Sequence, residues 1–296
     1  MEWRSAGLGW PDGNPVLRWD RGRTSPLSYG KEIGFRAVGE RYCVGARGNA
    51  CPLGAVVAAR ASQARCAECA RLDRAFSVAA DGVPDDPRTY RVYLAWFGAG
   101  MAKVGITAEE RGSARLLEQG AVAFSWLGRG PLMAARRTEE LLRAALGVPD
   151  RIPYAKKRAV RHALPPWPER VAEIGELHGR AVALPGWPDS LERVAFEAVD
   201  HSAAFGLAGL APPTRVVGEL AADGVVAGRL VAAAGPDLHL VEATAGGADG
   251  GVLVLDTRLM SGWSLTGGDG VTTVPVREIE VAGAGDGAGG VQEGLF

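Results

Sequence analysis

Four cysteines in one short stretch have the side chains needed to bind a metal ion. Their spacing is Cys43-x7-Cys51-x14-Cys66-x2-Cys69, and they are the only cysteines in the chain. Two thiolates two residues apart can hold a metal from one tight turn, and a second pair from another turn completes a tetrahedral site. We therefore predict a structural zinc ion with no open position for catalysis. The alternative is a redox pair of Cys66 and Cys69, which leaves Cys43 and Cys51 unexplained.

A second pattern lies on two predicted strands. Residues 92–94 read Val-Tyr-Leu, and after a turn residues 103–107 read Lys-Val-Gly-Ile-Thr. This pattern resembles that of the GIY-YIG endonucleases, in which two strands of a small sheet carry Gly-Ile-Tyr and Tyr-Ile-Gly. Residues 115–119 resemble the Arg-Leu-x-x-His segment of that family, with Gln119 at the histidine position. Together with the cysteines, the chain is similar to an uncharacterised bacterial family of unknown function that joins a four-cysteine cluster to a GIY-YIG-like core.

The resemblance implies hydrolysis of phosphodiester bonds at a Mg²⁺ or Mn²⁺ ion held by a glutamate. Arg115 would bind the phosphate, and the Tyr93 hydroxyl would help to activate the attacking water. Lys103 stands where the family has its second tyrosine. A lysine there could hold a phosphate, but it accepts no proton at neutral pH unless its pKa is strongly depressed. The alternative is that both motifs are simply two buried strands around a turn.

The metal-binding glutamate of this pattern is predicted to be Glu139. The segment 132–146 is predicted to be a helix with one apolar face, formed by Leu132, Ala135, Leu142 and Leu146. Glu139 falls on that inward face, whereas Glu140 falls on the polar side. An inward carboxylate needs a partner, and a divalent cation or Arg115 would serve. If the helix is rotated from this phase, both glutamates are solvated.

Basic residues lie on this helix and in a run that follows it. The side chains that could follow a phosphate backbone are Arg136, Arg137, Lys156, Lys157 and Arg158. A solvated helix face is an equally good interpretation of such a run.

The end of the chain carries a short sequence motif of the kind that binds a partner protein as an extended peptide. Gln292, Leu295 and Phe296 follow the pattern Gln-x-x-Leu-Phe, after a glycine-rich stretch at 283–290. This motif resembles the peptide with which bacterial proteins bind the replicative sliding clamp, and a flexible tether would present it. The alternative is that Leu295 and Phe296 pack back onto the protein.

The elements that would position these residues form an α+β fold. We expect a zinc-bound, β-rich N-terminal part, a small GIY-YIG-like α/β core, a helical connector and a C-terminal antiparallel β-barrel or sandwich. Gly- and Pro-rich turns mark the boundaries. These give an N-terminal β segment (1–40), a four-cysteine module (41–87), the core (88–150), a basic helical connector (151–210), the C-terminal β domain (211–282) and a tail (283–296).

Bulk composition limits the possible partners. The 296 residues suffice for one large or two modest domains. The formal net charge is −1, so a nucleic-acid contact would depend on a local patch. The chain opens without a signal-like segment, and its longest apolar run, 224–235, is short and broken by Arg229. We therefore expect a cytoplasmic protein with no membrane partner.

Three classes of function fit these features. The first is a metal-dependent nuclease that acts on DNA in replication or repair and is recruited by the clamp. The second is a non-catalytic, zinc-containing adaptor that binds nucleic acid, and the third is a zinc-stabilised protein-interaction module. Tyr93, Arg115 and Glu139 together favour the first class, whereas Lys103 favours the second. The tail motif weighs against the third, and we place the nuclease slightly ahead.

Overall fold

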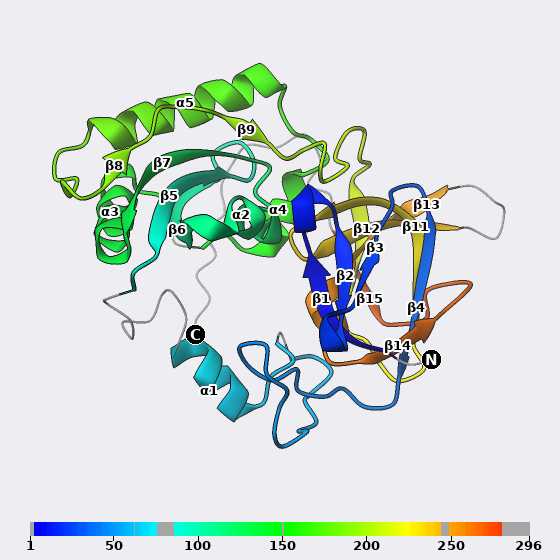
Figure 1. Ribbon diagram of the computed structural model, residues 1–296. Helices are drawn as coiled ribbons and strands as arrows, with labels where there is room; N and C mark the ends of the chain where they lie inside the picture. The colour runs from blue at the N-terminus through cyan, green and yellow to red at the C-terminus, as the bar shows by residue number, and fades with distance from the viewer. Residues whose placement is uncertain (1–2, 62, 76–85, 150, 244–248, 280–296) are drawn as a thin grey trace, which may run out of the picture.

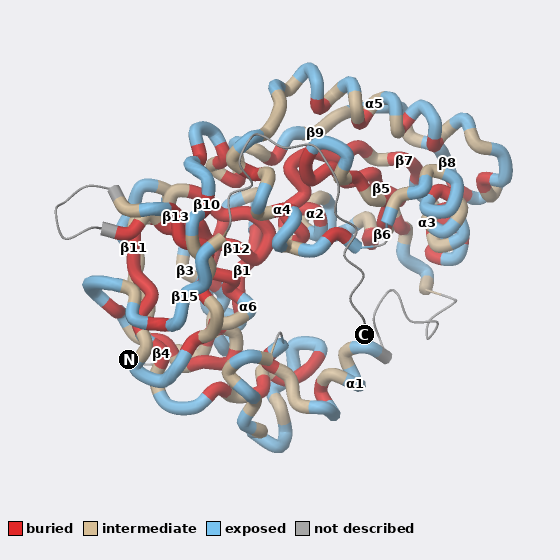
Figure 2. The backbone as a smooth tube through the Cα atoms, turned by 180° about the vertical axis from the view of Figure 1, so that it is seen from behind, coloured by how far each residue is buried: buried red, intermediate tan, exposed pale blue. Residues whose placement is uncertain are grey.

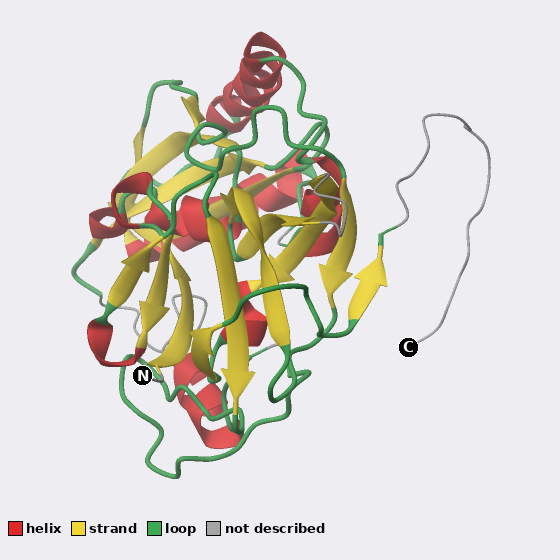
Figure 3. Cartoon of the chain, turned by 90° about the vertical axis from the view of Figure 1, so that its right-hand side faces the viewer, coloured by secondary structure: helices red, strands yellow, loops and turns green. Residues whose placement is uncertain are grey.

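The described chain is built mainly from two β-sheets (Figure 1). The structure is a computed structural model, and it describes residues 3–61, 63–75, 86–149, 151–243 and 249–279. The larger sheet has ten strands. Figure 3 shows neighbouring strands side by side, with loops joining their ends. In spatial order they are β15 (Val276–Glu278), β10 (Pro213–Val217), β13 (Asp249–Asp256), β12 (Asp237–Ala243), β11 (Val225–Ala234), β4 (Glu32–Val38), β14 (Ser264–Gly267), β1 (Trp3–Gly9), β2 (Val16–Trp19) and β3 (Thr24–Pro26).

Both ends of the described chain contribute to this large sheet. Strand β4 pairs with β11 on one side and with β14 on the other, so Phe35 lies opposite Val226. The N-terminal segment and the C-terminal β region, expected as separate units, therefore form one sheet. The pairing joins backbone edges that are distant along the chain, and the composition of each strand does not encode its partner. Strands β10 and β13 pair in parallel, so the sheet is not wholly antiparallel as expected.

The smaller sheet carries the segment in which the second motif lies. Its strands follow the order β6-β5-β7-β8, and β9 also pairs with β7. Their bounds are β6 (Ala102–Ala108), β5 (Thr89–Trp96), β7 (Ala123–Pro131), β8 (Glu192–Arg193) and β9 (Val199–Asp200). Residues 92–97 are buried without interruption, because other elements cover both faces of the central strand β5.

The described residues form α-helices at both sheets and in the cysteine-containing segment. They are α1 (Ala67–Ala75), α2 (Ala114–Gln119), α3 (Leu132–Leu146), α4 (Tyr154–Val160), α5 (Trp167–Ala183) and α6 (Thr257–Met260). Helix α3 has the bounds that its periodicity predicts, and it ends at Gly147, whose φ of +66° suits a glycine cap. Helix α5 lies along β7 in Figure 1, and both α3 and α5 contact strands of the smaller sheet. Within the described ranges, no helix is long and apolar enough to cross a membrane.

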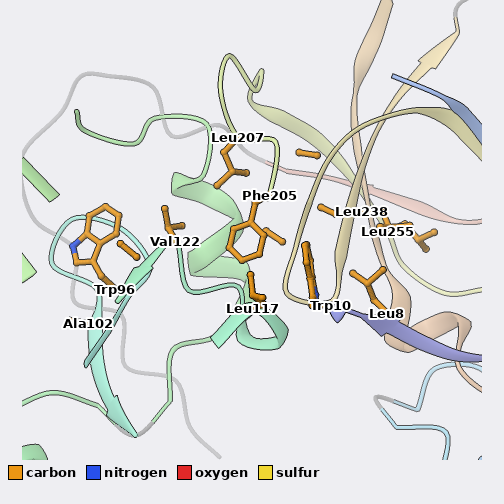
Figure 4. Packing of buried hydrophobic residues seen from close by; sticks show 14 of the residues in the cluster. Leu8, Trp10, Trp96, Ala102, Leu117, Val122, Phe205, Leu207, Leu238 and Leu255 are labelled. Atoms are coloured by element: carbon orange, nitrogen blue, oxygen red, sulfur yellow. The ribbon is translucent and has the colours of Figure 1, made fainter. Parts of the chain in front are cut away.

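The apolar core is continuous between the two sheets. Figure 2 shows buried stretches running through the strands of both, and Figure 4 shows Trp10, Leu117 and Phe205 close to one another between them. The rings of Trp10 and Phe205 meet edge to face at 5.0 Å, and Trp10 Nε1 donates to the carbonyl of Gly235 at 3.1 Å. The two sheets thus share one apolar core, to which α2 and the loop around Phe205 contribute.

Candidate functional site

The four cysteines come together in space. Their Sγ atoms all lie within 4.8 Å of one another, and those of Cys51 and Cys66 are 3.9 Å apart. In a tetrahedral site with Zn–S bonds of about 2.3 Å, neighbouring sulfurs lie ~3.8 Å apart. All four are free thiols. The group therefore has the donor atoms and spacing to hold a metal ion such as zinc.

A tight hairpin explains how the wide spacing of the first two cysteines is closed. Ala46 and Asn49 exchange backbone hydrogen bonds of 3.1 and 2.9 Å, which reverses the chain between Cys43 and Cys51. Gly45 has a φ of +81°, and a Cβ atom there would lie 1.8 Å from the Asn49 carbonyl oxygen. Only glycine fits this turn, so the seven intervening residues fold away from the metal-binding group.

The surroundings of the thiols suit bound thiolates. The backbone N–H groups of Gly45 and Cys66 donate to Cys43 Sγ at 3.4 and 3.2 Å. Backbone hydrogen bonding lowers the pKa of Cys51, whereas burial and the neighbouring thiols raise the pKa of Cys69. Four negative thiolates repel one another in this space unless a cation lies among them. The donor set therefore fits a divalent metal held by four sulfurs.

A buried arginine fastens the cysteine-containing segment to the large sheet. Arg41 is only 2% exposed, and burial lowers its pKa. Its Nε donates to the carbonyl of Ser261 and its Nη2 to that of Arg258, both at 2.9 Å, at the α6 turn. Its Nη1 donates to the carbonyls of Ala58, Ala59 and Ala61 at 2.8 to 2.9 Å. The sequence gives no signal for this role, because nothing distinguishes Arg41 from the exposed arginines.

Tyr93 and Gln119 form a hydrogen-bonded pair at the smaller sheet. Gln119 Nε2 donates to Tyr93 Oη at 2.9 Å, and both side chains are buried. Burial raises the pKa of Tyr93, and Arg115, Glu139 and Arg111 act on it through their charges. The structure thus brings the predicted residues Tyr93, Arg115 and Glu139 into one neighbourhood.

Lys157 adds a buried ammonium group to this neighbourhood. Its Nζ donates to the Gln119 carbonyl at 2.9 Å and lies 3.8 Å from the centre of the Phe97 ring. Burial, followed by the positive charges of Lys103 and Arg161, lowers the pKa of Lys157 to about 7.

We refer to Lys103, Arg111, Arg115 and Lys157 as the cationic cluster. The side chains of Arg111 and Arg115 are 44% and 48% exposed, and Lys103 is half-buried. Glu118 accepts from Arg111 at 2.9 Å and lies 3.8 Å from Arg115, so one carboxylate serves two guanidinium groups. Sequence reasoning missed Arg111, although its place in the short connection between β6 and α2 could have indicated it.

Glu139 and Glu140 differ in exposure. Glu139 is half-buried and Glu140 is exposed. The predicted helix phase likewise places Glu139 on the inward face and Glu140 on the polar side. Three or more metal-binding side chains gather only at the cysteines among the residues that the structure describes. A Mg²⁺ or Mn²⁺ site at Glu139 therefore has no support.

The structure separates the predicted phosphate-binding side chains. Arg137 and Lys156 are exposed and Arg136 is half-buried, but Lys157 is buried. Arg158 is bound inside the protein: its guanidinium donates to Asp237 at 3.0 Å and to Asp256 at 2.8 Å. A basic run does not indicate such pairing, because the partner carboxylates are distant in sequence. Gln292, Leu295 and Phe296 lie outside the described residues.

Comparison with known proteins gives one match. The family model described as "Protein of unknown function (DUF2797)" matches residues 30–265, which is most of the chain. The match spans the cysteines and strands of both sheets. No curated protein and no solved structure matches.

The resemblance to GIY-YIG endonucleases is wrong. The match is to an uncharacterised family, and nothing in the comparisons relates the chain to those nucleases. Strand packing explains the local pattern: Tyr93 lies opposite Gly105 in the register of β5 and β6, and a Cβ atom on Gly105 would lie 2.3 Å from Tyr93 Oη. The tyrosine ring therefore requires a glycine on the neighbouring strand. The catalytic roles taken over from that family for Tyr93, Lys103, Arg115 and Glu139 lose their basis.

Proposed function

Because the chain belongs to the DUF2797 family, whose function is unknown, we propose from its own residues that it is a non-catalytic, zinc-containing protein that binds nucleic acid. The observation that carries this proposal is the cationic cluster beside the Tyr93–Gln119 pair. Its ligand would be the phosphate backbone of a nucleic acid, in the first place DNA.

The charges of the cluster support an anionic ligand. Burial lowers the pKa of Lys157 most, and the charges of Lys103, Arg161 and Arg115 lower it further, whereas Asp237 raises it. A phosphate close to these groups would relieve their repulsion. Arg115 is suited to the contact, because a guanidinium group can donate two hydrogen bonds to a phosphate and half of its side chain is exposed.

The net charge of the chain limits how strong this binding is. With a formal net charge of −1, no large positive field surrounds the protein. Binding then depends on a few local phosphate contacts, and it should be modest and sensitive to salt.

Zinc has a structural part in this proposal. Four sulfur ligands fill a tetrahedral zinc site, so the ion would hold the segment around Cys43, Cys51, Cys66 and Cys69 in place without reacting. Reduced thiols of this kind fit the reducing cytoplasm, where we place the protein.

The test is the salt dependence of nucleic-acid binding. Binding of a labelled DNA strand is measured by fluorescence anisotropy at a series of salt concentrations. The logarithm of the binding constant should fall linearly with the logarithm of the salt concentration. Arg115→Ala should weaken binding and reduce that slope by about 1, because one phosphate contact is lost. The control is Arg180→Ala, which removes an exposed arginine on α5 outside the cluster. The proposal fails if the wild type shows no salt-dependent binding, or if the two variants behave alike.

The tail motif remains a second, independent proposal about partners. We propose that Gln292, Leu295 and Phe296 bind the replicative sliding clamp, with roughly micromolar affinity for the isolated peptide. Titration of labelled clamp should show binding by the wild type and none by the Leu295→Ala, Phe296→Ala double variant. Equal binding by the two proteins would remove the clamp from the proposal and leave nucleic-acid binding untouched.

A further inference from the structure

A cavity lies between the β1–β2 connection, helix α2 and the segment 201–204. Its volume is about 330 Å³, at the lower end of the range for small-molecule sites. Trp10, Leu117 and Ala204 supply apolar lining, and Figure 4 shows Trp10 and Leu117 close together at this junction. Since Trp10 and Leu117 are buried, they form the inner part of the cavity.

The polar lining of the cavity consists of hydrogen-bonding groups of different kinds. His201 Nδ1 lies 3.0 Å from the Ala121 carbonyl, so this nitrogen carries the proton and donates. Burial lowers the pKa of His201, which keeps the ring neutral and leaves Nε2 as an acceptor. The Asp12 carboxylate is a second acceptor, and the Ser113 hydroxyl can either donate or accept.

The walls of this cavity are fixed in position. Trp10 is held by its hydrogen bond to Gly235 and by the Phe205 ring. His201 lies between the rings of Phe124 and Phe205, at 5.1 and 5.7 Å. A cavity whose side chains are already held loses little entropy when a ligand enters.

Arg111 connects the cavity to the cationic cluster. It lines the cavity, and it shares the Glu118 carboxylate with Arg115 of the cluster, at 2.9 and 3.8 Å. A ligand that places a phosphate at the cluster can therefore reach into the cavity with the group attached to that phosphate. A nucleotide has this form: a phosphate, a sugar and a base with an apolar face and a hydrogen-bonding edge.

We propose that the cavity receives one unpaired nucleobase of a single strand whose phosphates lie on the cationic cluster, an inference that rests on the proposed function. The base edge would donate to His201 Nε2 or to Asp12, with Trp10 and Leu117 against its apolar surface. A base inside a duplex is stacked and paired, so it cannot enter. The protein therefore prefers single strands to duplexes.

The test compares two labelled strands of equal length and equal phosphate number, one with bases and one abasic. If a base enters the cavity, the wild type binds the strand with bases about tenfold more tightly, in the range expected for one stacked base. Ala204→Leu fills the cavity and should reduce this ratio to about 1, while its affinity for the abasic strand stays that of the wild type. Unchanged affinity for the abasic strand also shows that the variant is folded.

The matched control is Ala203→Leu, the same substitution at the preceding, exposed residue, which should keep the wild-type ratio. A wild-type ratio of one, or equal ratios for the Ala204 and Ala203 variants, would overturn the base site and leave phosphate binding intact. Failure of the wild type to bind either strand in a salt-dependent way would instead overturn the proposed function, and the base site with it.

Discussion

Lys157 is a buried lysine surrounded by groups of both signs. Its ammonium group meets the Gln119 carbonyl and the rings of Phe97 and Tyr154. The charges that face it come from Lys103 on β6, Arg161 directly after α4, Arg115 on α2 and Asp237 on β12. Burial is the main reason why the pKa of Lys157 falls to about 7, and three of these four charges are positive and lower it further. The neutral amine is therefore the better-tolerated form in the folded protein above neutral pH.

This shift predicts how stability depends on pH. The unfolded chain keeps Lys157 protonated up to its ordinary pKa of 10.5, whereas the folded protein releases the proton from about pH 7. Between these values the unfolded state binds more protons, so the contribution of Lys157 to stability rises with pH. Relative to Lys157→Met, the free energy of unfolding of the wild type should rise by up to about 1.4 kcal/mol per pH unit in this window.

Urea denaturation at pH 6.5 and pH 9 measures this effect. The control is Lys156→Met, because Lys156 is the exposed neighbour. Its replacement should change the free energy of unfolding by the same amount at both pH values. Parallel pH profiles for the wild type and Lys157→Met would show that Lys157 keeps an ordinary pKa.

The sequence identifies charged residues but not their partners. The consecutive residues Lys156, Lys157 and Arg158 have different surroundings. Lys156 is exposed, Lys157 is buried against the Gln119 carbonyl and two aromatic rings, and Arg158 is bound by carboxylates. Helical rotation by about 100° per residue turns neighbours to different sides. The partner Asp237 belongs to a strand far along the chain, so no local pattern predicts the pair.

At the scale of elements, local patterns predict more. The helix at 132–146 has its predicted bounds, because apolar periodicity and glycine or proline stops act within a few residues. The order of strands in a sheet depends on contacts between distant segments, and the ten-stranded sheet was not predictable for that reason. The cysteine site is an exception, since four thiols close in sequence have few other uses.

The cysteine-containing segment has little regular structure beyond α1 and only a small apolar cluster of its own. A metal ion should therefore contribute much of its stability. Metal analysis of the purified protein should find about one zinc per chain. Removal of the ion, or Cys69→Ala, should speed backbone hydrogen exchange around Cys43 and Cys66, whose thiol and amide are bonded to each other.

The strands β11 to β13 provide the internal control for this experiment. Their amides lie in the middle of the large sheet and should keep their protection when the metal is removed. A disulfide in place of bound metal, found by mass analysis under non-reducing conditions, would contradict the zinc site and favour the redox alternative.

At the scale of the whole molecule, a buried ionic cluster joins helix α4 to the larger sheet. Asp237, at the start of β12, accepts from Arg158 on α4 and from Arg161 directly after it, at 3.0 and 2.7 Å. Burial alone would raise the pKa of Asp237, but Arg161 and Arg158 lower it. Asp237 and Arg161 are both completely inaccessible to solvent. A charge in this position is tolerated only while its partner is present.

This cluster predicts that the two sheets unfold together. Arg161→Met should cost about 3 to 5 kcal/mol of unfolding free energy, because it leaves a buried carboxylate with one arginine fewer. Asp237→Leu should cost a similar amount, and the double variant should cost less than the sum by about 2 kcal/mol. The matched pair is Arg91 and Glu109, which are 2.7 Å apart but partly exposed, and whose coupling should stay below about 1 kcal/mol.

Chemical denaturation should follow one transition in the wild type, since Asp237 ties α4 to β12 and the core is continuous between the sheets. Two separate transitions, or additive effects of Arg161→Met and Asp237→Leu, would mean that the sheets are independent and that this contact does not couple them.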